Sequence, residues 1–265
     1  YLNIFGKYAL SSDYKIPDGR YVFNSRFKKS GFKLSSAYNS SKWIGKLFYQ
    51  FDGQRLGIPA HSHDINPNLD DLLGSSRYFY LTRPNQFADN HLLNFQNTFF
   101  LDNLKIKIDI GHFINRLQEY EAWTTSEFDL LLSSTQFNFN LNKPINQYLK
   151  INFGAQSILQ KNKNLPSRSI LLPDFTSNDY GLFSILEYEK NNWGAALGLR
   201  GDIRKIKSEN INPSFEVMST SLGLYKSMNN HNIKISYSNG FRSPHTSELL
   251  NDGVHHGTNR YEIGN

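Results

Sequence analysis

The final stretch of the sequence, residues 240–265, gathers residue types that could bind a metal ion: GFRSPHTSELLNDGVHHGTNRYEIGN. His255 and His256 follow Glu248 and Asp252, and imidazole and carboxylate groups are ligands that zinc uses in proteins. Adjacent residues of an extended segment point to opposite faces, so at most one of the two histidines can face a shared ion, and His256 is the candidate. The alternative is a loop with a structural role.

A second metal candidate is the run His61-Ser62-His63-Asp64, with Asp70 and Asp71 shortly after it as possible further ligands. Two histidines and a carboxylate could hold zinc or a similar cation if a fourth ligand converged on them. Two histidines at positions i and i+2 without a fixed scaffold are a weak signal, and a solvated polar loop is the competing interpretation. We expect this loop to contribute to a ligand site.

Three arginines are candidates for binding an anion, because a guanidinium group matches a carboxylate with two parallel hydrogen bonds. Arg77 and Arg83 lie in the same long connection as the His61 run. Arg242 precedes Pro244 at the edge of an expected strand, so a structural role is favoured for it.

Catalytic chemistry finds little support in the sequence. The 265 residues contain no Cys, which excludes thiolate metal sites, disulfides and Cys nucleophiles. No nucleophile elbow, phosphate-binding loop or metalloprotease helix is present, so we expect no enzyme and no resident cofactor. The net charge of +6 admits an anionic partner, but the basic residues are mostly scattered singly, with Lys28-Lys29 as an adjacent pair, which argues against nucleic acid.

Alternation with a period of two residues runs through nearly the whole chain and predicts an all-β fold. Between residues 104 and 114 one face is aliphatic, while Lys105, Lys107 and Asp109 lie on the other. The runs 149–160 and 193–204 show the same split, with Lys150, Asn152, Arg200, Asp202 and Arg204 on the polar face. Such strands suit either a half-exposed soluble sheet or the lipid-facing wall of a barrel.

The lengths of the connections favour the barrel. We expect strands at 2–9, 27–38, 42–51, 91–100, 104–114, 127–141, 146–160, 179–188, 193–204, 215–226 and 232–240. Short joins alternate with long ones, so an up-and-down meander would carry tight turns on one rim and long loops on the other, as outer-membrane barrels do. Aromatic residues near the short joins would form a girdle at the membrane surface: Trp43, Phe99, Phe100, Phe137, Phe139, Tyr188, Trp193 and Tyr225.

About eleven strands are expected, an odd number, whereas single-chain bacterial barrels use even numbers. We therefore expect an antiparallel up-and-down transmembrane β-barrel of which this chain is only one part.

The closing stretch resembles a characteristic segment of TonB-dependent outer-membrane receptors, of the pattern GFR-x-P, EL and E-x-G-N. The residues that carry this resemblance are Gly240, Phe241, Arg242, Pro244, Glu248, Glu262, Gly264 and Asn265. Shorter stretches are similar to the ferric dicitrate type of the family: residues 55–59, 115–121, 171–174 and 199–202. The resemblance covers essentially the whole chain.

The resemblance implies a barrel of about 22 strands that is closed by an N-terminal plug domain, with residues 1–265 forming a partial barrel domain. It implies an active-transport receptor in the outer membrane of a Gram-negative bacterium. Its expected partners are a ferric chelate such as a siderophore or ferric citrate, the TonB complex acting through the plug, and outer-membrane lipid with lipopolysaccharide.

Other functions stay open at this point. A passive porin would share the membrane wall, and a receptor of the same family could carry haem, cobalamin or zinc. A soluble or surface β-protein that binds sugars is the third class of hypothesis. It would stay monodisperse without detergent, which distinguishes it from the membrane proteins.

Overall fold

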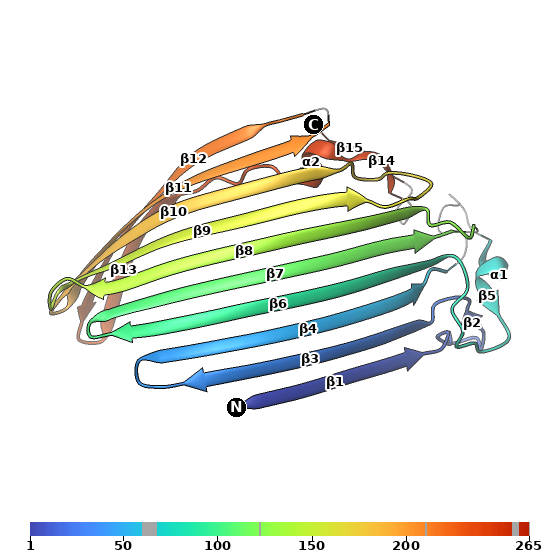
Figure 1. Cartoon of the computed structure of the whole chain (residues 1–265), viewed down its shortest axis with the longest axis horizontal. Helices are drawn as coiled ribbons and strands as arrows, with labels where there is room; N and C mark the ends of the chain where they lie inside the picture. The colour runs from blue at the N-terminus through green and yellow to red at the C-terminus, as the bar shows by residue number, and fades with distance from the viewer. Residues whose placement is uncertain (60–67, 122, 210, 256–259, 265) are drawn as a thin grey trace.

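The computed structural model describes residues 1–59, 68–121, 123–209, 211–255 and 260–264. Its main body is one eleven-stranded antiparallel sheet in the order β1-β3-β4-β6-β7-β8-β9-β10-β11-β12-β13 (Figure 1). The strands are β1 (Leu2–Ser11), β3 (Phe27–Asn39), β4 (Trp43–Gly57), β6 (Asn85–Leu101), β7 (Leu104–Tyr120), β8 (Phe128–Pro144), β9 (Leu149–Asn164), β10 (Phe175–Lys190), β11 (Trp193–Ser208), β12 (Ser214–Met228) and β13 (His231–Asn239).

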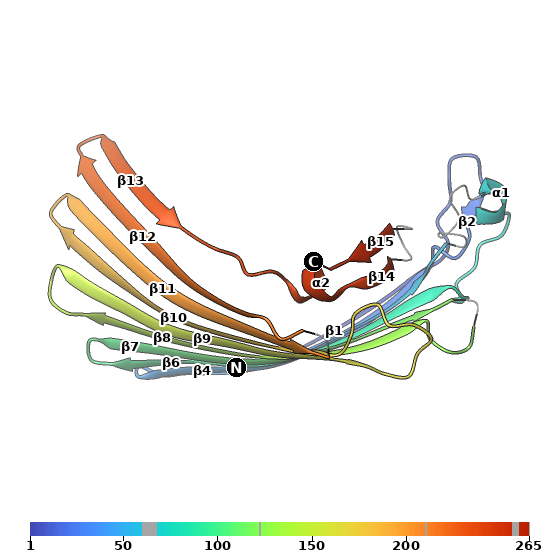
Figure 2. The same cartoon turned by 90° about the horizontal axis from the view of Figure 1, so that it is seen from above.

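Each strand pairs with its neighbours along the chain, so the predicted up-and-down meander is confirmed. The sheet curves strongly, and its edge strands β1 and β13 do not pair with each other (Figure 2). The remaining elements are short: β2 (Tyr21–Val22), α1 (Leu69–Leu72), β5 (Leu73–Gly74), α2 (Thr246–Leu250), β14 (Asp252–His255) and β15 (Arg260–Ile263). Among the described residues no helix has the length and apolar character needed to cross a membrane.

The two faces of the sheet differ as the alternation predicted. On the convex face, Leu186, Leu197 and Leu222 lie directly opposite one another on β10, β11 and β12. All three are exposed by more than a third of their surface. Residues of opposite parity point into the concavity, where α2, β14 and β15 lie (Figure 2). Those concave residues include the polar set expected inside: Lys105, Lys107, Asp109, Lys150, Asn152, Arg200, Asp202 and Arg204.

Very little apolar surface is buried within the sheet itself. Among the described residues only Phe128, Phe175, Ile206 and Leu250 are buried hydrophobic side chains. A soluble chain of this size would bury a large apolar core. A continuous aliphatic surface on one side of an antiparallel sheet instead fits contact with lipid.

Short and long connections alternate between the two ends of the sheet, as predicted (Figure 1). Asp102, Asn191 and Asn229 begin two-residue turns at one end, and all three have positive φ angles. Asn and Asp tolerate this left-handed backbone and are favoured in tight hairpins. The expected strand limits were too short at the long-connection end. β6 begins at Asn85 rather than near residue 91, and β7 continues to Tyr120.

An aromatic girdle lies on the convex face beside the short turns. Trp43 stacks on Phe99 with ring centroids 6.4 Å apart, and the ammonium of Lys226 lies 4.4 Å from the centroid of Trp193. The prediction was wrong for Phe100 and Tyr225, which are paired with Lys105 and Gly194 and point to the concave side. Their parity along the strand excludes them from the girdle.

A charge placed in the middle of the convex face should be costly. We expect Leu222→Arg to destabilise the protein folded in lipid vesicles by about 2–4 kcal/mol, the cost of an Arg near the bilayer centre. Ser221→Arg, on the adjacent concave position, is the matched control and should change little. Equal losses for both variants would contradict the assignment of the two faces.

Candidate functional site

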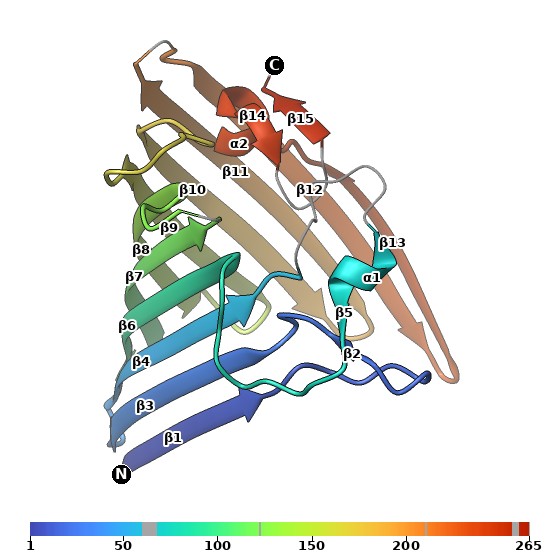
Figure 3. The same ribbon diagram turned by 90° about the vertical axis from the view of Figure 1, so that its right-hand side faces the viewer.

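The long connections gather at one end of the sheet, and they form the candidate ligand-binding rim. Figure 3 views the molecule from this end, with β2, α1 and β5 on one side and α2, β14 and β15 on the other. Two groups of contacts fix the rim. One joins the β1–β3 connection to the β4–β6 connection, and the other folds the segment after β13 back onto the wall.

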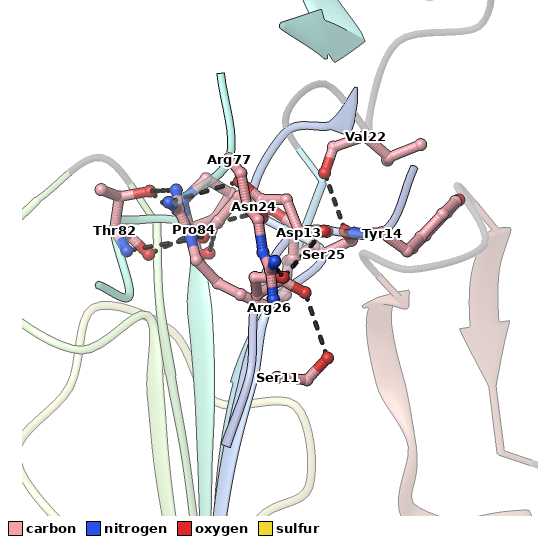
Figure 4. A network of polar contacts seen from close by, with 12 residues as sticks. Ser11, Asp13, Tyr14, Val22, Asn24, Ser25, Arg26, Arg77, Thr82 and Pro84 are labelled. Atoms are coloured by element: carbon pink, nitrogen blue, oxygen red, sulfur yellow. Dashed lines mark hydrogen bonds and ion pairs between the residues drawn. The ribbon is translucent and has the colours of Figure 1, made fainter. Parts of the chain in front are cut away.

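Asn24 holds the first group together (Figure 4). Its side chain is completely buried, and its backbone is left-handed, with a φ of 60°. The amide Nδ2 donates to the carbonyl oxygens of Ile58 at 2.8 Å and Pro84 at 2.6 Å, and Oδ1 accepts from the Thr82 hydroxyl at 3.1 Å. One side chain therefore joins both ends of the described β4–β6 connection to the start of β3.

Arg26 extends this group inward (Figure 4). Its guanidinium Nη2 donates to the Thr82 hydroxyl at 3.0 Å, and the group lies over the rings of Phe23 and Tyr78. Asp13 Oδ2 lies 3.4 Å from Arg26 Nη1, and both side chains are almost fully buried. Among the described residues no group donates a hydrogen bond to this carboxylate, so its attraction to Arg26 is what opposes the cost of its burial.

Removing the Asn24 amide should loosen both connections. For Asn24→Ala we expect the free energy of local opening of residues 12–26 and 68–84 to fall by about 2–4 kcal/mol, because several buried groups lose their partners. Hydrogen exchange measures this opening. Asn24→Gly is the control, since glycine adopts the left-handed backbone freely. Full protection in the Gly variant would show that backbone conformation, not the amide, holds the loops.

Arg77 and Arg83, the two predicted anion anchors, lie at this rim with exposed side chains. Arg77 Nε donates to the Ser12 hydroxyl at 2.7 Å, and its guanidinium lies 4.8 Å from the centroid of Phe79. The guanidinium of Arg83 lies 5.9 Å from the centroid of Tyr120. Within the described ranges neither has a carboxylate partner, so both positive charges are available to an anion.

The segment after β13 is organised by a capped helical turn. The His245 side chain accepts from the Ser247 backbone, and Glu248 accepts from the His245 backbone N–H at 2.6 Å, which forms a capping box on α2. Arg242 donates two parallel hydrogen bonds of 2.9 Å to the same carboxylate. These bonds from Arg242, with that from His245, lower the pKa of Glu248 to about 2.

The same segment is fastened to the concave wall. Arg204 Nη1 donates to the Pro244 carbonyl at 3.0 Å while its other nitrogens hold Asp179 at 2.7 Å. Leu250 is buried against Phe175 and Ile206. A recess of about 330 Å³ remains between the wall and the segment, lined in part by Gln156, Asp179, Arg200, Asp202, Arg204 and Arg242.

These contacts explain four of the eight residues that carry the resemblance in the closing stretch. Arg242, Pro244 and Glu248 shape the turn and its attachment, and a side chain at Gly264 would collide with the Leu249 backbone at 2.4 Å. A Cβ at Gly240 would meet no described atom within 4 Å, and Phe241 is an exposed residue at the edge of the recess. The structural role favoured for Arg242 therefore has a physical basis.

The metal hypotheses gain no support from the described residues. His61, His63, Asp64, His256 and Asn265 lie outside them. His255 and Glu262 belong to β14 and β15, but their side chains are not described. In the part of the chain that the structure describes, no three His, Cys, Asp or Glu side chains are gathered as metal ligands.

Sequence reasoning missed the groups that organise the rim. Asn24 and Arg26 carried no motif, and their partners are backbone carbonyls or residues distant in the chain. His245 also carried no motif, although its partners Ser247 and Glu248 are close in sequence. The only available signal was local: an Asn that tolerates a left-handed turn just before a strand, and a Glu three residues after a possible helix cap.

Acid should weaken the closing turn. Because the pKa of Glu248 is about 2 in the folded chain and near 4.3 in an unfolded one, its stabilisation is complete above about pH 4.3. It is lost as the pH falls toward 2. We expect hydrogen-exchange protection of residues 245–250, corrected for intrinsic rates, to fall between pH 6 and pH 2.5. Glu248→Gln should be poorly protected at both values; strong protection at pH 6 would contradict this role.

The open, curved, two-faced meander with segregated turns and long loops defines the wall of an outer-membrane type of β-barrel. The family model described as "TonB dependent receptor-like, beta-barrel" matches residues 2–265. The chain therefore belongs to the family of TonB-dependent receptor barrels. No curated protein matches the chain.

Solved structures share the fold at low sequence identity. The FrpB iron transporter from Neisseria meningitidis (F5-1 variant) matches with a TM-score of 0.65 at 16% identity, over 92% of this chain and 43% of that one. The alcaligin outer-membrane receptor FauA from Bordetella pertussis gives 0.62 at 12%, over 89% and 38%. The ferric citrate transporter FecA, unliganded, gives 0.52 at 11%, over 88% and 41%. The chain thus spans less than half the length of each.

Proposed function

We propose that this chain is part of the wall of an outer-membrane receptor that binds a ferric chelate and imports it with energy transmitted by TonB. The observation that carries the proposal is the match of residues 2–265 to the receptor barrel family. The names of three structural relatives, an iron transporter, an alcaligin receptor and a ferric citrate transporter, support iron as the cargo.

In this proposal the unpaired edges of β1 and β13 continue into strands outside the chain, and the closed barrel surrounds a plug. The convex face meets lipid and lipopolysaccharide in the outer membrane of a Gram-negative bacterium. The long connections face the cell exterior, and the TonB complex acts on the plug from the other side. No catalytic step and no resident cofactor belong to this function.

The rim supplies the chemistry for an anionic cargo. Arg77 and Arg83 are exposed cations on the β4–β6 connection, which Asn24 ties to the β1–β3 connection. Guanidinium groups suit carboxylate-rich ferric chelates. His61, His63 and Asp64, in the same connection, stay candidates for the ligand site. Between the two membrane hypotheses the family match favours a receptor over a passive porin.

Removing the two free arginines should impair uptake of an anionic ferric chelate. For Arg77→Ala with Arg83→Ala in the full-length receptor, we expect the KM for ferric citrate uptake by iron-starved cells to rise about tenfold or more, since hydrogen bonds to charged groups contribute about 1.5–3 kcal/mol each. Uptake of radioactive iron measures this directly.

Arg20→Ala is the matched control. Arg20 lies at the same rim, but Asp18 and Asp70 already neutralise its charge at 2.7 and 3.0 Å. We expect nearly normal uptake in this variant. An unchanged KM in the double variant, or an equal rise in the control, would contradict an anion site at Arg77 and Arg83.

A further inference from the structure

The convex face changes from aliphatic to basic toward the long-connection end of β9–β11. Thr176 on β10 lies directly between Lys161 on β9 and Lys207 on β11. The next convex position of β10, Asn178, is paired with Lys205. All three lysines are exposed, as is the nearby Lys163.

These lysines border the apolar surface. Lys161 follows Leu159 by two residues, and Lys205 follows Ile203 by two, so each lysine shares the convex face with an aliphatic side chain one position nearer the middle of the sheet. Both aliphatic side chains are about 40% exposed, Leu159 at 41% and Ile203 at 39%. A ligand lying along this face would contact aliphatic side chains near the middle of the sheet and ammonium groups near the long-connection end.

Two acidic residues lie beside this lysine cluster (Lys161, Lys163, Lys205 and Lys207): Asp174 precedes Thr176 by two residues and accepts hydrogen bonds from Asn164 at 2.7 Å, and Glu209 follows Lys207 by two. Elsewhere at the same height of the convex face, Arg55 and Arg116 each hold an aspartate, Asp89 and Asp129, at 2.7 Å. Within the described residues, by contrast, the four lysines form no ion pair. Glu216, the acidic residue nearest by register on β12, is paired with Ile203.

Polar groups complete the surroundings of the cluster. A groove of about 430 Å³ is lined by Thr176, Asn178, Lys205, Lys207, Asn212 and Ser214, with Ile206 and Pro213. Neighbouring strands are about 4.8 Å apart, so the backbones of Lys161 and Lys207 lie about 10 Å from each other across Thr176. Two long ammonium side chains and a hydroxyl can therefore converge on one tetrahedral anion.

We propose that the lysine cluster binds a phosphate group of a phosphorylated glycolipid in the outer leaflet of the membrane. Charge complementarity with the cluster selects the phosphate, and the aliphatic convex surface beside it accepts acyl chains. A free phosphate ion would interact with the charge of the cluster but not with the aliphatic surface. This inference rests on the membrane orientation in the proposed function, but not on the cargo.

Native mass spectrometry of the full-length receptor in detergent can test the site with four probes. They are a lipid A-type glycolipid with two phosphates, the same lipid after phosphatase treatment, phosphatidylglycerol, and inorganic phosphate. We expect tight binding of the phosphorylated glycolipid alone. In Lys161→Gln, Lys205→Gln, Lys207→Gln its affinity should fall roughly 100-fold, since each lysine beside an anionic lipid contributes about a factor of five.

Two further variants separate this site from general charge effects. Lys143→Gln, Lys190→Gln, Lys226→Gln removes three lysines from the same face near the short turns, and should bind normally. Replacing Lys161, Lys205 and Lys207 by Arg keeps the charge and should preserve binding. Heat-modifiable electrophoretic mobility verifies that each variant is folded. If the triple Gln variant does not fold, binding by the triple Arg variant decides whether the lysine cluster is the site.

Equal binding of the dephosphorylated lipid, equal binding of phosphatidylglycerol, or an equal loss in the short-turn control would overturn the proposal. So would loss of binding in the Arg variant. Ferric-chelate uptake by the same variants distinguishes the two proposals. A receptor that retains the glycolipid but imports no ferric chelate contradicts the proposed cargo, while normal uptake without phosphate-dependent lipid binding contradicts only the lipid site.

Discussion

Backbone hydrogen bonding across the whole sheet is the constraint on which the rest of the structure depends. A strand that crosses an apolar medium must pair every N–H and C=O group, because no water is present to satisfy them. The continuous antiparallel ladder from β1 to β13 does so for every strand except at the two outer edges. Once the backbone is satisfied, alternate side chains are free to meet two different environments.

The polar interior follows from that division. On the concave face, guanidinium groups are held by neighbouring carboxylates, as Arg204 is by Asp179 and Arg200 is by Asp202. The same Arg204 also fastens the segment after β13, so the wall positions the rim. At the other side of the rim, Asn24 joins two long connections through backbone carbonyls. Loops that a receptor would need for binding are therefore supported by buried polar contacts, not by an apolar core.

The sequence alone predicted the strands, their order and their faces, because period-two alternation is strong wherever one face is aliphatic. The predicted strand ends were wrong where the two faces no longer differ in polarity. β6 and β7 extend beyond the aliphatic region through Asp89 and Arg116, whose pairing with Arg55 and Asp129 replaces hydrophobic contact on the convex face. The His, Glu and Asp residues of the closing stretch could equally indicate a metal site or a structural turn. The capping box that decides for a turn depends on how His245 and Glu248 meet in space. The burial of Asn24 could not be foreseen either, because its partners are carbonyls more than thirty residues away.

The two-faced sheet predicts that the convex face meets lipid while the concave face meets water. Single cysteines carrying nitroxide labels can be placed along β7 of the full-length receptor in lipid bilayers, and residues 1–265 contain no native Cys that would compete for the label. Collisions with oxygen and with a water-soluble paramagnetic reagent then report each environment. We expect relaxation dominated by oxygen at Ile106, Ile108 and Ile110, and relaxation dominated by the water-soluble reagent at Lys105, Lys107 and Asp109. Uniform accessibility along the strand, or alternation of the opposite phase, would contradict it.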